Sequence, residues 1–185
     1  MVRADPWLIF LGAFFLLVLP LKWLLAAVTA AAFHEFCHWA AIRLLGGQVL
    51  RLHLGVGGAV MEANIPGNGW EFFCALAGPL GSFLLLFLFR IFPRLAICGL
   101  IQGCFNLLPF FPLDGGRMLQ CLTVRLSPVR SRQVCGSVEA AAALGLIFLV
   151  TILPLDALWK LFAVLLLSWR ILGKKPCKRR RIGVQ

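Results

Sequence analysis

His34, Glu35 and His38 form a His-Glu-x-x-His pattern inside a strongly apolar stretch of the chain. On a helix, residues four apart project from the same face, so both imidazoles can bind one ion with the carboxylate beside them. In such patterns the two histidines hold zinc and the glutamate takes a proton from water. A catalytic zinc usually has three protein ligands, so the pattern predicts a third ligand elsewhere in the chain.

The best candidate for the third ligand is Asp114, within the segment Asn106–Arg117. An acid near the centre of a bilayer costs about 2.5–3.5 kcal/mol on insertion scales, so something must compensate it. Two prolines before it interrupt helical hydrogen bonding, and two glycines after it let the backbone turn or approach another helix. Irregular backbone at membrane depth is tolerated where protein or a water-filled cavity surrounds it. We therefore expect Asp114 to meet His34 and His38 in a wet pocket nearer the cytoplasmic face.

The composition predicts a polytopic membrane protein that lies in a lipid bilayer. Of 185 residues, 61% are hydrophobic and only 14% are charged, whereas about a quarter of a soluble domain is charged. The net charge of +11 comes from basic residues at the ends of apolar runs, which favours contact with anionic lipid over binding to nucleic acid. The seven cysteines include no CxxC pair and indicate reduced thiols rather than a disulfide framework.

Six apolar segments could position these residues, although some are shorter than the roughly 20 residues that a straight span needs. They are Trp7–Leu19, Leu21–Leu45, Trp70–Phe89, Leu95–Cys121, Val138–Leu153 and Leu155–Leu172. Basic residues concentrate on the side that holds both ends of this layout, so both termini are expected in the cytoplasm. The sequence thus predicts an all-α fold of about six transmembrane helices, with one transmembrane domain over residues 1–173 and a basic cytoplasmic tail over residues 174–185.

The segment Gly46–Gly69 separates the second and third apolar runs and is rich in glycine. Partial alternation after Gly46 is typical of a strand or a short β-hairpin at the membrane face, and an ordinary interfacial loop fits equally well. An exposed strand edge there could pair with an extended peptide. His53 lies in this segment without a spaced partner, which favours a solvated loop residue over a metal ligand.

Together these motifs resemble the site-2 protease family of intramembrane zinc metalloproteases, which is M50-like. His34–His38 matches the HExxH motif of the family, Asn106–Gly116 matches its NxxPxxPLDGG motif, and Ala77–Leu80 resembles the Gly-Pro element of its third core helix. The resemblance covers residues 24–122, the catalytic core. The six-span layout is most similar to the bacterial sporulation branch, which cleaves the membrane-associated pro-form of a sigma factor.

The resemblance implies His34, His38 and Asp114 as zinc ligands and Glu35 as the general base. It also implies that Asn106 positions the substrate or the oxyanion, although an amide that only packs helices together stays open. The expected partners are a membrane protein or membrane-associated proprotein as substrate and inhibitory membrane regulators. No PDZ or CBS domain is expected in the chain.

Two other functions remain open from the residues alone. Buried histidines and carboxylates also line pathways in divalent metal transporters and channels, although ligands would then repeat along several spans. An inactive relative that binds membrane partners is the other alternative, although an inactive site would be free to lose its histidines and acids. Gly78, Gly81 and Ser82 are expected to serve close helix packing, and Cys37 is expected to point away from the histidines.

Overall fold

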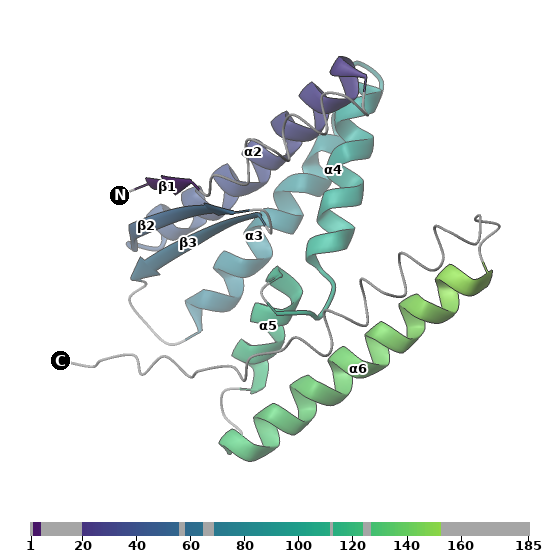
Figure 1. Ribbon diagram of the computed structural model, residues 1–185. Coiled ribbons are helices and arrows are strands. Elements are labelled where there is room, and N and C mark those ends of the chain that lie inside the picture. The colour runs from purple at the N-terminus through teal and green to yellow at the C-terminus, as the bar shows by residue number, and fades with distance from the viewer. Residues whose placement is uncertain are drawn as a thin grey trace. The chain divides into compact units, whose positions relative to one another are not determined.

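The computed structural model describes residues 2–4, 20–55, 58–64, 69–111, 113–123 and 127–152. Its helices are α2 (Leu21–Leu44), α3 (Trp70–Leu84), α4 (Pro93–Asn106), α5 (Asp114–Thr123) and α6 (Pro128–Ile152), and a 3-10 helix over Leu85–Leu88 follows α3 (Figure 1). The strands are β1 (Val2–Ala4), β2 (Gln48–Gly55) and β3 (Gly58–Asn64). The chain forms two compact units, residues 1–135 and 136–185, and the first unit holds the residues of the candidate site.

The described residues include three helices that are long and apolar enough to cross a membrane: Leu21–Leu44, Trp70–Leu88 and Val129–Leu149. They correspond to the second, third and fifth expected spans. The expected fourth span is two shorter helices, because the chain leaves α4 after 14 residues and turns before α5 begins. The first and sixth expected spans lie outside the described residues, so the count of six stays a prediction.

A β-hairpin follows α2, so of the two interpretations of this segment the strand is correct. β2 and β3 pair antiparallel from Gln48 with Asn64 to Gly55 with Gly58, with an irregularity between Val49 and Arg51. β1 adds a parallel strand to the other side of β2, which the sequence did not indicate because three residues are too few to show alternation. In the described sheet, β3 is therefore an edge strand.

Small residues bring α2, α3 and α4 together side by side (Figure 1). Ala30 of α2 and Ala96 of α4 are completely buried. Gly99 of α4 lies so close to α3 that an added Cβ would be 2.8 Å from the carbonyl oxygen of Ser82. Small residues at helix interfaces allow backbones to approach in this way, which is how membrane helices gain packing contacts without a hydrophobic driving force.

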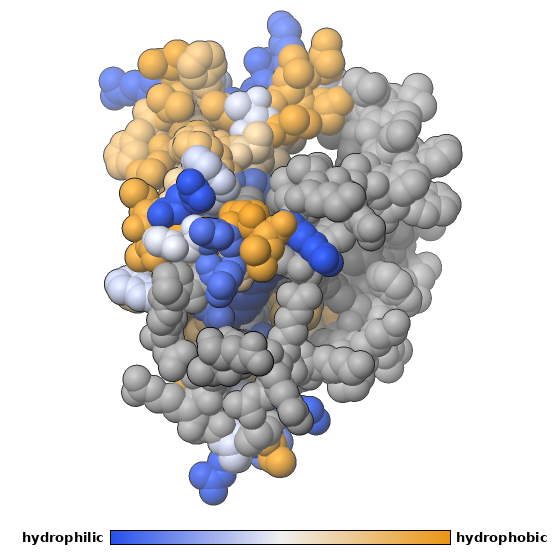
Figure 2. Space-filling model, turned by 90° about the vertical axis from the view of Figure 1, so that its left-hand side faces the viewer, coloured by the Kyte–Doolittle hydropathy of each residue, from blue (hydrophilic) through white to orange (hydrophobic). Residues whose placement is uncertain are grey.

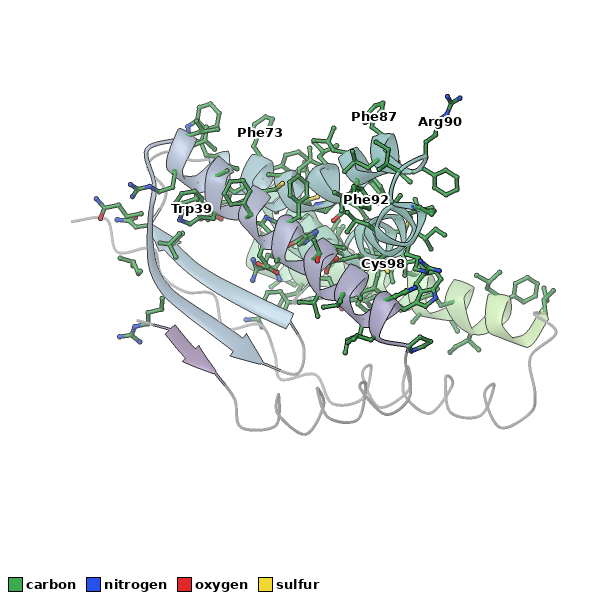
Figure 3. The ribbon with its side chains drawn as sticks, turned by 90° about the horizontal axis from the view of Figure 1, so that it is seen from above. Trp39, Phe73, Phe87, Arg90, Phe92 and Cys98 are labelled. Atoms are coloured by element: carbon green, nitrogen blue, oxygen red, sulfur yellow. The ribbon has the colours of Figure 1, made fainter. Side chains whose placement is uncertain are left out.

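The outer surface of the helices is largely apolar, whereas the buried side chains between them include polar ones. Leu44 and Phe87 are 87% and 86% exposed, and Figure 3 shows Phe73 and Phe87 pointing away from the helices. In Figure 2 hydrophobic residues gather over the upper part of the described surface, where α2 begins. His34, Ser82 and Asp114 are buried instead. This arrangement suits a bundle whose outside meets lipid and whose inside holds polar chemistry.

Candidate metal centre

His34 and His38 lie on the buried face of α2, in one stripe with Ala30 and Ile42. The four positions are four residues apart, so the helix places them one above another. Only 2% of His34 and 8% of His38 are exposed, and the two rings meet edge to face with centroids 4.8 Å apart. The local helix therefore holds both imidazoles in one orientation toward the other helices.

Asp114 reaches the histidines because the chain folds back tightly between α4 and α5. An added Cβ on Gly115 would lie 2.6 Å from the carbonyl oxygen of Leu108, and one on Gly116 would lie 2.5 Å from the carbonyl carbon of Phe110. The two glycines are thus needed for contact with the preceding turn, rather than with another helix. Asp114 is the first residue of α5, where the amides and the dipole of the helix favour a carboxylate.

Three side-chain atoms form a compact triangle within the first unit. Oδ2 of Asp114 lies 3.1 Å from Nε2 of His34 and 3.1 Å from Nε2 of His38, and the two nitrogens are 3.2 Å apart. All three residues are buried, and together they form a group that could hold a metal ion. The structure thus brings together the three residues that the sequence analysis singled out as ligands.

The chemistry of the donor atoms fits a cation inside this triangle. Nδ1–H of His38 donates to the backbone carbonyl of Cys74 at 2.7 Å. A carbonyl can only accept, so a neutral His38 carries its hydrogen on Nδ1 and presents a lone pair on Nε2. Ligand atoms of a tetrahedral zinc site, with bonds of about 2.0–2.1 Å, lie about 3.3 Å apart. The spacing and the lone pair therefore both match a zinc site.

Glu35 and Asn106 flank the triangle. Glu35 is half-buried on α2, and its charge lies within electrostatic reach of both histidines, Asp114 and Arg117. Asn106 is the last residue of α4, and its Nδ2 lies 3.4 Å from Nε2 of His34. Asn106 thus lies beside one candidate ligand, and Glu35 interacts electrostatically with all three.

The part that α3 plays in this centre was not predicted from the sequence. Gly78 adjoins the triangle so closely that an added Cβ would overlap Nε2 of His38 and lie 2.7 Å from Nε2 of His34. Nδ1 of His34 lies 2.8 Å from Oγ of Ser82. Gly78 and Ser82 had been expected only to pack helices. The available signal was their four-residue spacing, which places both on the same face of α3.

Two further residues lie apart from the three donors. The side chain of Cys37 lies against Gly81 of α3, so Gly81 serves close helix packing as expected. Cys37 does not belong to the group that could hold a metal ion. His53 lies in β2 rather than in a loop, with its backbone paired to Val60.

The chain is similar in sequence to a known peptidase family and to two zinc metalloproteases. Residues 82–153 match peptidase family M50, a segment that contains Asn106 and Asp114. A zinc metalloprotease of Methanocaldococcus jannaschii is 31% identical over an aligned length of 150 residues, and the match covers 70% of this chain and 44% of that protein. A protein of Synechocystis that is named as a zinc metalloprotease is 28% identical over an aligned length of 195 residues, and the match covers 88% of this chain and 50% of that protein. The chain thus spans about half the length of the curated relatives it matches.

The fold has a counterpart among solved structures. A site-2 protease from Methanocaldococcus jannaschii superposes with a TM-score of 0.56 at 23% sequence identity. The superposition covers 80% of this chain and 74% of that structure. At this identity the likeness establishes the shared fold.

Proposed function

The chain belongs to peptidase family M50, the site-2 protease family, and on this premise we propose that it is an intramembrane zinc metalloendopeptidase. The observation that carries the proposal is the buried triangle of His34, His38 and Asp114. Its atoms come from α2 and from the start of α5. His34 and Asp114 are 80 residues apart in the chain. Polar groups in an apolar bundle are unfavourable unless a partner compensates them, and one divalent cation would compensate all three.

The reaction follows from the roles that these side chains can take. His34 and His38 would hold zinc through Nε2, and Asp114 would hold it through a carboxylate oxygen. Bound zinc would supply a Lewis acid for water and for the scissile carbonyl. Glu35 accepts a proton from the attacking water and returns it to the leaving amine. Asn106 lies beside His34, where its amide can orient the substrate carbonyl.

The substrate class follows from the backbone that the reaction needs. A peptide in a helix hides its carbonyls in hydrogen bonds, so the cleaved segment must be extended. None of the described strands pairs with the outer edge of β3, and this edge could hold such a segment by strand addition. We extend the proposal to membrane proteins and membrane-associated proproteins as substrates, with the pro-form of a sigma factor as one case and inhibitory membrane proteins as regulators. The support for the sigma factor is the resemblance of the expected six-span layout to the sporulation branch.

We also propose that the protein is a multi-pass integral membrane protein of bacterial origin, with both termini in the cytoplasm. Three apolar helices among the described residues support the membrane location. The support for the orientation is the concentration of basic residues on one side of the expected layout.

The test of this function is co-expression with a panel of single-span and membrane-associated candidate substrates. The native chain should cleave at least one of them. Glu35→Gln should lower cleavage by about 10²- to 10⁴-fold, the contribution typical of a general base, and should retain zinc. Glu71→Gln, which removes a carboxylate from α3 outside the triangle, is the matched control and should cleave normally. Undiminished cleavage by Glu35→Gln would refute the assigned role of Glu35, and a native chain without bound metal would refute the proposed function.

A further inference from the structure

One face of α3 carries a hydrogen-bonding partner for each histidine. Cys74, Gly78 and Ser82 are four residues apart and therefore lie in one stripe along this helix. Ser82 faces His34 and Cys74 faces His38, as antiparallel packing of α2 and α3 requires. Gly78 lies between them, against both Nε2 atoms. The stripe thus contacts every ring nitrogen of the two candidate ligands.

The two partners differ in chemistry. His38 donates to the backbone carbonyl of Cys74, which is present whatever side chain stands at position 74. His34 meets the hydroxyl of Ser82, which is a side-chain group and can either donate or accept. Ser82 is completely buried and His34 is 2% exposed, so no solvent is at hand to replace this hydroxyl. The orientation of His34 therefore depends on one side chain, whereas that of His38 does not.

We propose that Ser82 is a positioning residue of the metal centre, because its hydroxyl accepts Nδ1–H of His34 and thereby directs the Nε2 lone pair toward His38 and Asp114. The inference rests on the proposed function, since it concerns the binding of zinc in this triangle. A neutral imidazole carries one hydrogen on either nitrogen, and the partner of one nitrogen decides what the other can do. Without the hydroxyl, His34 can place its hydrogen on Nε2, where it would block coordination.

The experiment measures zinc affinity of the full chain in detergent, by competition with a chromophoric chelator. Ser82→Ala should weaken zinc binding by about 10- to 100-fold, the usual effect of removing a partner of a metal ligand. Ser82→Thr keeps a hydroxyl and should restore affinity. Cys74→Ala is the matched control, because it also removes one buried atom from the same face of α3 and keeps the carbonyl that His38 uses. Its affinity should equal that of the native chain.

Three other results would contradict either the positioning role of Ser82 or the proposed function. Equal zinc affinity of Ser82→Ala and the native chain would overturn the positioning role. An equal loss in Cys74→Ala would also overturn it, because packing along the stripe would then explain both effects. A native chain that binds no zinc would refute the proposed function itself, so the two failures can be distinguished.

A second measurement needs no variant at the site. The chain has three histidines, so nitrogen-15 labelling gives a simple NMR spectrum of its rings. In the zinc-loaded native chain, His34 should show a hydrogen on Nδ1 and none on Nε2. A His34 ring that is bound to zinc through Nδ1 would overturn the proposal even if Ser82→Ala failed to fold.

Discussion

At the scale of single residues, the position of the hydrogen on each imidazole decides which ring nitrogen can bind a metal ion. His38 must keep its hydrogen on Nδ1 to bond the carbonyl of Cys74, which leaves an unshared pair on Nε2. That pair faces Oδ2 of Asp114 at 3.1 Å and Nε2 of His34 at 3.2 Å. Unshared pairs at such distances repel one another unless a cation or a proton lies between them, and a low dielectric makes this repulsion stronger.

Asp114 provides the residue-scale prediction. Asp114→Asn should lower zinc affinity by more than the roughly 10- to 100-fold typical of residues that only support a ligand, because it removes the one negative charge of the triangle. Glu71→Gln changes an acid to its amide on α3 and should leave affinity unchanged. Chelator competition with both variants and the native chain measures the effect. Native affinity in Asp114→Asn would mean that the third ligand lies elsewhere.

The sequence left two roles open for Asn106, contact with the substrate and packing between helices. The structure shows which candidate ligand lies beside it. Its Nδ2 lies 3.4 Å from Nε2 of His34, so it adjoins the candidate ligands instead of packing only against apolar side chains. Its place at the end of α4, directly before the turn that leads to Asp114, ties it to the same segment. Its role toward a substrate stays a prediction.

At the scale of helices, α2 and α5 carry the candidate ligands, and α3 packs against these ligands. Its backbone lies against α2 at Gly78 and against α4 near Ser82, where Gly99 leaves room for it. Such close packing leaves no space for an additional carbon atom. A larger side chain at Gly78 should therefore disturb zinc binding directly.

Gly78→Ala is the element-scale prediction. The new methyl group would overlap the imidazole of His38, so zinc binding should be lost and the free energy of unfolding should fall by about 1–3 kcal/mol, as for overpacking in a full core. Leu80→Ala, two residues along the same helix at a side chain that is 52% exposed, should bind zinc normally. Zinc competition and denaturant unfolding in detergent measure both effects. Normal zinc binding by Gly78→Ala would show that α3 does not adjoin the metal as described.

At the scale of the molecule, the order of the elements separates the two ends of the helices. α2 and α3 are antiparallel neighbours joined through the β-hairpin, and the connection from α3 to α4 lies at the other end (Figure 1). If α2 crosses the membrane inward, the hairpin lies at the cytoplasmic face and the connection near Arg90 lies at the opposite face. The sheet and the turn before α5 would then reach the site from the same side.

Labelling of introduced cysteines tests this orientation. A membrane-impermeant thiol reagent applied to intact cells should modify Arg90→Cys and leave Asn64→Cys unmodified. Inverted membrane vesicles should give the opposite pattern, because they expose the cytoplasmic face. The native chain, with its own seven cysteines, sets the background for each preparation. Labelling of Asn64→Cys from outside intact cells would reverse the proposed orientation.

The sequence by itself determined what is periodic or local in this protein. Apolar length gave α2 and α3, the spacing of His34 and His38 gave a common face, and glycine-rich alternation gave the possibility of the hairpin. Proline and glycine around Asp114 indicated irregular backbone. Each of these follows from rules that act within a few residues, so they can be read without knowing the fold. Matching of paired motifs added the family, which the comparisons establish.

Only the tertiary structure decided which distant groups meet. Nothing local to Ser82 shows that its hydroxyl lies 2.8 Å from an imidazole 48 residues away, or that the carbonyl of Cys74 fixes the hydrogen of His38. The parallel pairing of β1 with β2 and the fit of Gly115 and Gly116 against the preceding turn are of the same kind. Such contacts depend on how helices and strands pack in space, and a sequence pattern records the face of an element but not what lies against it.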